Sequence, residues 1–156
     1  MVDHKFEGER PTDLITLVVR RTIRATPERL FDAWTQPSEF KQWWGPDGVT
    51  CIAAEIDLRV GGRYRIGNQF PDGSVVWIVG EFQVIEAPHR LIYTWQIEDS
   101  VEPSELVIVQ FESREGATEV IITHTRIPDR TKRNRHEQGW LGCLNGLAQY
   151  VGGTRC

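Results

Sequence analysis

The chain has 156 residues, of which 40% are hydrophobic and 26% charged, a composition typical of one globular domain with a sizeable core. Its formal net charge of -4 argues against a general nucleic-acid-binding domain, because such domains are normally basic. No apolar run is long enough for a membrane span, and the N-terminus lacks the apolar core of a signal peptide, so we expect a cytoplasmic protein.

The cysteine content is also typical of a cytoplasmic protein. Cys51, Cys143 and Cys156 are odd in number and lack the spacing of a metal site. We therefore expect reduced thiols rather than a disulfide framework.

The chain begins with a polar stretch, residues 1–13, which we expect to be a flexible arm. Residues 14–24 then alternate between apolar and polar side chains, a pattern that predicts a half-buried strand. Arg21 falls on the apolar side of this strand. A cation there needs a carboxylate or carbonyl partner, and Arg21 is the best candidate for a buried charge.

Two short helices are expected next. Thr26 is a good N-cap, and Pro27 suits the first helical position. Pro37 restarts the chain as a second helix, which ends at Gly45 and carries Phe40, Trp43 and Trp44.

From Thr50 the alternation has a period of two and predicts an antiparallel sheet with one wet face. The expected strands span residues 50–58, 63–70, 74–86, 90–98, 104–113 and 117–127. Their inward-facing side chains are Tyr64, Ile66, Ile78, Gly80, Phe82, Val84, Leu91, Tyr93, Trp95, Ile97, Val107, Val109, Phe111, Val120, Ile122 and His124.

Residues 129–151 read as one long helix of about six turns that covers the dry face of the sheet. Asp129 is the expected N-cap. The apolar stripe consists of Trp140, Leu144, Leu147 and Val151. Gly139, Gly142 and Gly146 form a neighbouring stripe, which either deepens a cavity or lets the helix backbone pack closely.

Several stretches resemble one family. They are residues 40–46 (FKQWWGP), 57–62 (DLRVGG), 88–95 (PHRLIYTW), 123–124 (TH) and 136–140 (HEQGW). Together they look like the START-like (SRPBCC) superfamily, in the branch named after the activator of the Hsp90 ATPase and in its single-domain bacterial form. The resemblance covers residues 14–152.

The resemblance implies an α+β helix-grip fold, in which a curved antiparallel sheet wraps around a long C-terminal helix, with two short helices after the first strand. It also implies a deep cavity between sheet and helix that relatives commonly use for hydrophobic small molecules. It does not fix an activity, because relatives include lipid carriers, cyclases and the co-chaperone domain itself.

The candidate ligand-binding residues combine inward aromatic and apolar side chains with one histidine. Plain core packing is the competing interpretation for each of them. They are Trp44, Tyr64, Ile78, Phe82, Tyr93, Trp95, Val109, His124, Trp140 and Leu144.

His124 and His136 are the weak catalytic candidates, because either could reach the cavity and move a proton near neutral pH. The alternative is a structural histidine held by hydrogen bonds. Two histidines without a clustered Cys or Asp are not a recognisable metal-ligand set, so neither a metal nor a cofactor is expected.

The sequence therefore favours a non-catalytic domain that binds a hydrophobic or aromatic molecule. A cyclase or hydrolase using a cavity histidine is one alternative. A chaperone regulator or other interaction module is the other, with the basic segment Arg130, Lys132, Arg133 and Arg135 facing an acidic partner. A homodimer through the outer sheet face, where Trp77, Val79 and Ile121 are expected, stays open.

Overall fold

The computed structural model describes residues 14–45 and 48–152. The predicted arm, residues 1–13, lies outside this range. The elements in chain order are β1 (Ile15–Ile23), α2 (Pro27–Thr35), α3 (Pro37–Trp43), β2 (Thr50–Ile56), β3 (Arg63–Gln69), β4 (Val75–Glu86), β5 (Arg90–Ile97), β6 (Glu105–Arg114), β7 (Ala117–Ile127) and α4 (Arg130–Gly152).

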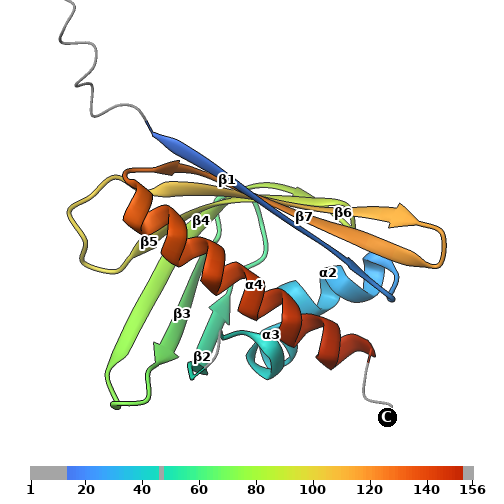
Figure 1. Cartoon of the computed structure of the whole chain (residues 1–156), viewed down its shortest axis with the longest axis horizontal. Helices are drawn as coiled ribbons and strands as arrows, with labels where there is room; N and C mark the ends of the chain where they lie inside the picture. The colour runs from blue at the N-terminus through green and yellow to red at the C-terminus, as the bar shows by residue number, and fades with distance from the viewer. Residues whose placement is uncertain (1–13, 46–47, 153–156) are drawn as a thin grey trace, which may run out of the picture.

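The strands form one seven-stranded sheet in the order β1-β7-β6-β5-β4-β3-β2, and each neighbouring pair is antiparallel. Strands β2 to β7 thus follow one another as a meander, and β1 pairs with β7 to form the edge of the sheet opposite β2. Figure 1 shows the strands bending around α4, with α2 and α3 beside the C-terminal half of that helix. The predicted α+β helix-grip arrangement is confirmed.

The two predicted N-caps, Thr26 and Asp129, both form. The Thr26 hydroxyl accepts a hydrogen bond from the Arg29 backbone N–H at 3.1 Å, and Pro27 occupies the first turn. The Asp129 carboxylate accepts from the Lys132 backbone N–H at 2.8 Å. Each cap satisfies a donor that the helix itself leaves free, a contribution of about 1 kcal/mol.

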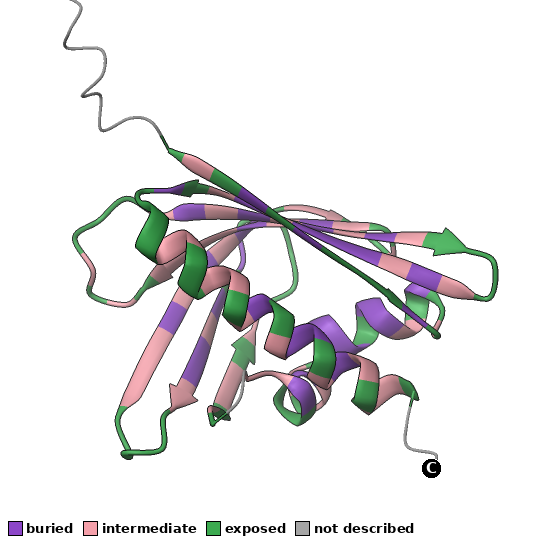
Figure 2. Ribbon diagram, viewed as in Figure 1, coloured by how far each residue is buried: buried purple, intermediate pink, exposed green. Residues whose placement is uncertain are grey.

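The main core lies between the sheet and the helices. Helix α4 packs on β1, β7, α2 and α3, and buried positions cluster on its inward side (Figure 2). The fully buried side chains of β6 and β7, such as Val107, Val109 and Ile122, belong to this core. Among the described residues, no helix is both long and apolar enough to cross a membrane.

The glycines of α4 divide between the two predicted roles. A Cβ on Gly146 would lie 2.6 Å from the Trp43 carbonyl oxygen, so this glycine lets α4 approach the end of α3. A Cβ on Gly139 would meet nothing within 4 Å. Gly139 therefore borders open space.

Two expectations about polar and outer-face residues were wrong. Arg21 is exposed rather than buried, although it does have the expected carbonyl partner, since its guanidinium donates to the Asn145 side-chain carbonyl oxygen at 3.4 Å. Ile121, expected on the exposed outer face, is only 6% exposed. On the same face, the Arg65 guanidinium lies 3.7 Å from the centre of the Trp77 ring and covers it.

Candidate functional site

A cavity of about 380 Å³ lies between the sheet and the N-terminal half of α4. Helices α2 and α3 pack against the C-terminal half of α4. The sheet beneath the N-terminal half of α4 is therefore not covered by these two helices. The cavity is lined by Trp44, Asn68, Phe70, Val76, Ile78, Trp95, Ile97, Glu105, His124, Lys132, Arg135, His136, Gly139, Trp140 and Cys143.

The cavity has the size and lining of a small-molecule site. Ligand pockets usually measure about 300–1,000 Å³ and combine apolar walls with a few fixed polar groups. Three indole rings, from Trp44, Trp95 and Trp140, form much of the wall here. The Trp44 indole N–H is held by the Asn68 side-chain oxygen at 3.1 Å, which fixes that ring in place.

The cavity opens beside α4. Phe70, Arg135 and Gly139 line both the cavity and an open groove between the β3–β4 turn and α4. Because Gly139 has no side chain, the opening at this point is wider than any other residue would leave it. Arg135 is exposed there and makes no hydrogen bond or ion pair with the described residues.

The polar centre of the cavity is a buried cluster of Glu105, His124, His136 and Trp140. Glu105 Oε1 lies 2.7 Å from His124 Nε2 and 2.8 Å from His136 Nε2. The Trp140 indole N–H donates to His124 Nδ1 at 3.0 Å. The two imidazoles stack with centres 4.2 Å apart, and Trp95 packs edge-on against both.

These contacts fix the proton on His124. An indole N–H can only donate, so Nδ1 of His124 must accept and cannot carry a proton. The neutral ring then carries its proton on Nε2, where it donates to Glu105. His124 is therefore a positioning residue, whereas Nδ1 of His136 has no hydrogen-bond partner among the described residues.

The pKa shifts agree with this arrangement. Burial raises the pKa of Glu105, but the hydrogen bonds from His124 and His136 outweigh it and bring the pKa to about 2. Burial lowers the pKa of His124, against the opposing effect of its hydrogen bond to Glu105. The cavity thus holds an ionised carboxylate beside a neutral imidazole.

Glu105, His124 and His136 also form a two-histidine, one-carboxylate donor set, with ligand atoms within 4.8 Å of one another. The sequence shows no Cys or Asp clustered with the histidines, and the carboxylate comes instead from Glu105 on another strand. A metal on Nε2 of His124 would nevertheless place that ring's proton on Nδ1, facing the Trp140 N–H. The Trp140 N–H and the His124 Nδ1–H would then point at each other without an acceptor. The cluster is therefore better arranged as a set of hydrogen bonds than as a metal site.

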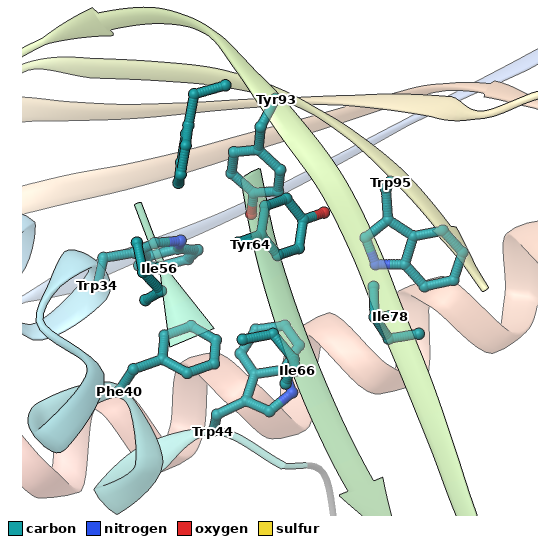
Figure 3. Close-up of a pocket in the computed structure, with 10 residues that line it drawn as sticks. Trp34, Phe40, Trp44, Ile56, Tyr64, Ile66, Ile78, Tyr93 and Trp95 are labelled. Carbon is teal, nitrogen blue, oxygen red and sulfur yellow. The ribbon is translucent and has the colours of Figure 1, made fainter. Parts of the chain in front are cut away.

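A second, smaller space lies deeper, where α2, α3 and the sheet meet (Figure 3). Its volume is about 30 Å³, room for about one water molecule. Tyr64, Phe82 and Tyr93 pack against one another here with ring centres 5.2–5.9 Å apart. The Tyr64 hydroxyl already donates to the Thr94 carbonyl at 2.6 Å.

The predicted ligand-binding residues are therefore divided between the large cavity, the small space and the packed core. Trp44, Ile78, Trp95, His124 and Trp140 line the large cavity. Tyr64, Phe82 and Tyr93 line only the small space. Val109 and Leu144 line neither and are fully buried in the core.

Sequence reasoning missed Glu105, although a signal was present. The alternation that places Val107 and Val109 inside places Glu105 inside as well, at the start of β6. Lys132 and Arg135 were noted only as part of a basic segment. Lys132 pairs with Glu102 and Arg133 with Glu137, so half of that segment is already neutralised within the chain.

The comparisons with known proteins agree with the fold. A family model described as activator of Hsp90 ATPase homolog 1-like protein matches residues 24–152. No curated protein matches the chain in sequence.

Solved structures extend the similarity. Protein CV1439 from Chromobacterium violaceum is 26% identical, with a TM-score of 0.82 over 89% of this chain and 98% of its own. The AHSA1 protein SPO3351 from Silicibacter pomeroyi is 26% identical, with a TM-score of 0.79 over 88% of this chain and 97% of its own. Protein Ms6760 from Mycobacterium smegmatis, at 20% identity and a TM-score of 0.79 over 93% and 95%, shares the fold.

Proposed function

Because the chain belongs to the family of activator of Hsp90 ATPase homolog 1-like proteins, we propose that it uses this fold to bind a hydrophobic, aromatic small molecule. The molecule occupies the space between the sheet and α4. No cofactor is needed, and binding itself is the function.

The observation that carries this proposal is the cavity of about 380 Å³ with three indole walls. Rigid aromatic side chains bury a flat ligand with little loss of conformational entropy. The surrounding hydrogen bonds hold Trp44 and Trp140 in place before a ligand arrives. A preformed wall of this kind favours affinity for aromatic molecules.

Tryptophan fluorescence tests the proposal directly. The purified protein is titrated with aromatic, polyketide-like and fatty-acid molecules, and saturable quenching by the aromatic class is expected. Trp95→Leu should weaken the binding because it removes one wall. Trp77→Leu is the matched control, because Trp77 lies on the outer face and lines neither of the two cavities described above.

Two results would contradict the proposal. One is the absence of saturable quenching by every class in the panel. The other is an equal loss of affinity in Trp95→Leu and Trp77→Leu, since that would point to general destabilisation rather than to the cavity.

The second candidate function is acid–base catalysis by His136. The observation that favours it is the Glu105–His136 pair, in which the carboxylate orients the imidazole and Nδ1 has no hydrogen-bond partner in the described part of the chain. The reaction would be a cyclisation or hydrolysis within the same cavity. The basic start of α4 gives less support to an interaction module, because Lys132 and Arg133 pair within the chain.

His136→Gln separates the two functions. An enzyme would lose turnover of a bound substrate while binding it with similar affinity, whereas a binding protein would show no turnover before or after the change. Ring opening or closure is followed by mass spectrometry of the recovered ligand.

A further inference from the structure

Glu105 is more than a support for the histidines, because one of its oxygens is unused. Oε1 accepts from both imidazoles. Oε2 makes no hydrogen bond to any residue of the part of the chain that the structure describes. The side chain is only 7% exposed, and it lines the large cavity.

A buried, ionised carboxylate oxygen without a donor is costly, so its presence in a cavity points to a group that arrives with the ligand. The oxygen can only accept. The incoming group must therefore bring an O–H or N–H, whereas a ketone or an ether would set lone pairs against it.

Trp95 further restricts which ligand group can bind beside Glu105. It lies directly opposite Glu105 in the pairing of β5 with β6, so both side chains stand on the cavity face of the sheet. Its indole N–H likewise makes no hydrogen bond to the described residues. A donor and an acceptor in neighbouring positions suit a hydroxyl group, which can do both.

The charges around the cluster favour a neutral donor over a cation. Lys132 and Arg135 line the cavity from α4. Lys132 has a carboxylate partner in Glu102, but Arg135 has none within the described residues. An ammonium group would meet these positive charges on its way to Glu105.

We infer that the cavity selects hydroxylated aromatic molecules, with the ligand hydroxyl donating to Glu105 Oε2 and accepting from the Trp95 indole. This inference rests on the proposed binding function and adds the chemical group that the site recognises. The histidine pair then serves to hold the carboxylate in place for that hydroxyl.

A matched pair of probes tests the inference. 1-Naphthol and 1-methoxynaphthalene have the same ring system, but only the naphthol can donate. Calorimetric titration of the wild-type protein should show the naphthol binding about tenfold or more tighter than the ether, as expected for a hydrogen bond to a charged group.

Glu105→Gln should abolish this preference, because the oxygen of the naphthol and the oxygen of the ether can both accept from the new amide. The amide oxygen can still accept from both histidines, and the amide NH₂ replaces Oε2 and donates to either probe. Glu102→Gln is the control, because Glu102 pairs with Lys132 outside the cluster, and it should keep the wild-type ratio. Circular dichroism checks that each variant is folded.

The outcomes separate the two proposals. Equal affinity of both probes for the wild-type protein would overturn hydroxyl selection and leave cavity binding standing. Failure of both probes to bind would overturn both. If Glu105→Gln does not fold, the ratio measured on the wild-type protein still decides.

Discussion

At the scale of single residues, the cluster around Glu105 determines the chemistry of the cavity. Trp140 fixes the tautomer of His124, and His124 in turn donates to the carboxylate. These hydrogen bonds run in one direction, from indole to imidazole to carboxylate. A proton or a metal ion added to His124 would therefore disrupt the hydrogen bond from Trp140 or the one to Glu105.

The first prediction concerns pH. Burial lowers the pKa of His124 below its ordinary value of 6.5, so the unfolded chain takes up a proton there before the folded protein does. This contribution to stability is complete above pH 6.5 and is lost as the pH falls through the lowered pKa of the folded state. The free energy of unfolding, measured in urea, should decrease with acidification over this range.

His124→Gln provides the control for that measurement. Glutamine can accept from Trp140 and donate to Glu105 but does not titrate, so the slope of stability against pH below 6.5 should flatten. An unchanged slope would show that His124 is not the group responsible.

The second prediction concerns metal binding. Zn²⁺ on Nε2 of His124 requires a proton on Nδ1, where the Trp140 N–H stands in the way. Trp140→Phe removes that donor and keeps an aromatic ring. Zn²⁺ should raise the melting temperature of Trp140→Phe more than that of the wild-type protein, and an equal or larger shift in the wild type would contradict the tautomer assignment.

At the scale of elements, α4 both closes the core and opens the cavity. Gly146 lies against the Trp43 carbonyl at the α3 end, and Gly139 borders open space at the cavity end. The C-terminal half of the helix therefore packs against α3, and the N-terminal half lines the cavity. This division within one helix could not be read from the spacing of its glycines.

The third prediction compares the two glycines. Gly146→Ala should lower the free energy of unfolding by about 1–3 kcal/mol, because the new methyl group pushes α4 away from α3. Gly139→Ala should raise it by about 1 kcal/mol, since alanine is the better helix former and nothing obstructs it. Urea unfolding of both variants measures the difference, and a shift of the same sign in both would contradict the assignment.

Local sequence signals predicted the elements well for a physical reason. The caps at Thr26 and Asp129 and the alternation in the strands depend on neighbours along the chain. The cavity depends on contacts between residues far apart, such as Glu105 with His136. Strand alternation is compatible with an inward Glu105, but only the pairing of β6 with β7 and the position of α4 bring it to the histidines.

The same limit explains the residues that were misplaced. Val109 and Tyr64 face inward as predicted, but alternation cannot tell a cavity wall from a packed core. Arg21 lies on the apolar side of its strand, yet it reaches Asn145 at the surface because β1 is an edge strand. Depth within the fold is a property of the assembled molecule.

At the scale of the whole molecule, the sheet, α2 and α3 grip one half of α4 and leave the other half over a cavity (Figure 1). The central claim is that an aromatic ligand enters this cavity beside Gly139. Because a Cβ there meets nothing within 4 Å, a larger side chain can fill the opening without disturbing the protein.

The most direct test is calorimetric titration of 1-naphthol into Gly139→Leu, with Gly139→Ala and the wild-type protein measured alongside. We predict that the leucine side chain abolishes or strongly weakens binding, while the alanine variant binds much as the wild type does. Equal affinity in all three folded proteins would contradict the claim, because the ligand would then bind somewhere other than the cavity beneath α4.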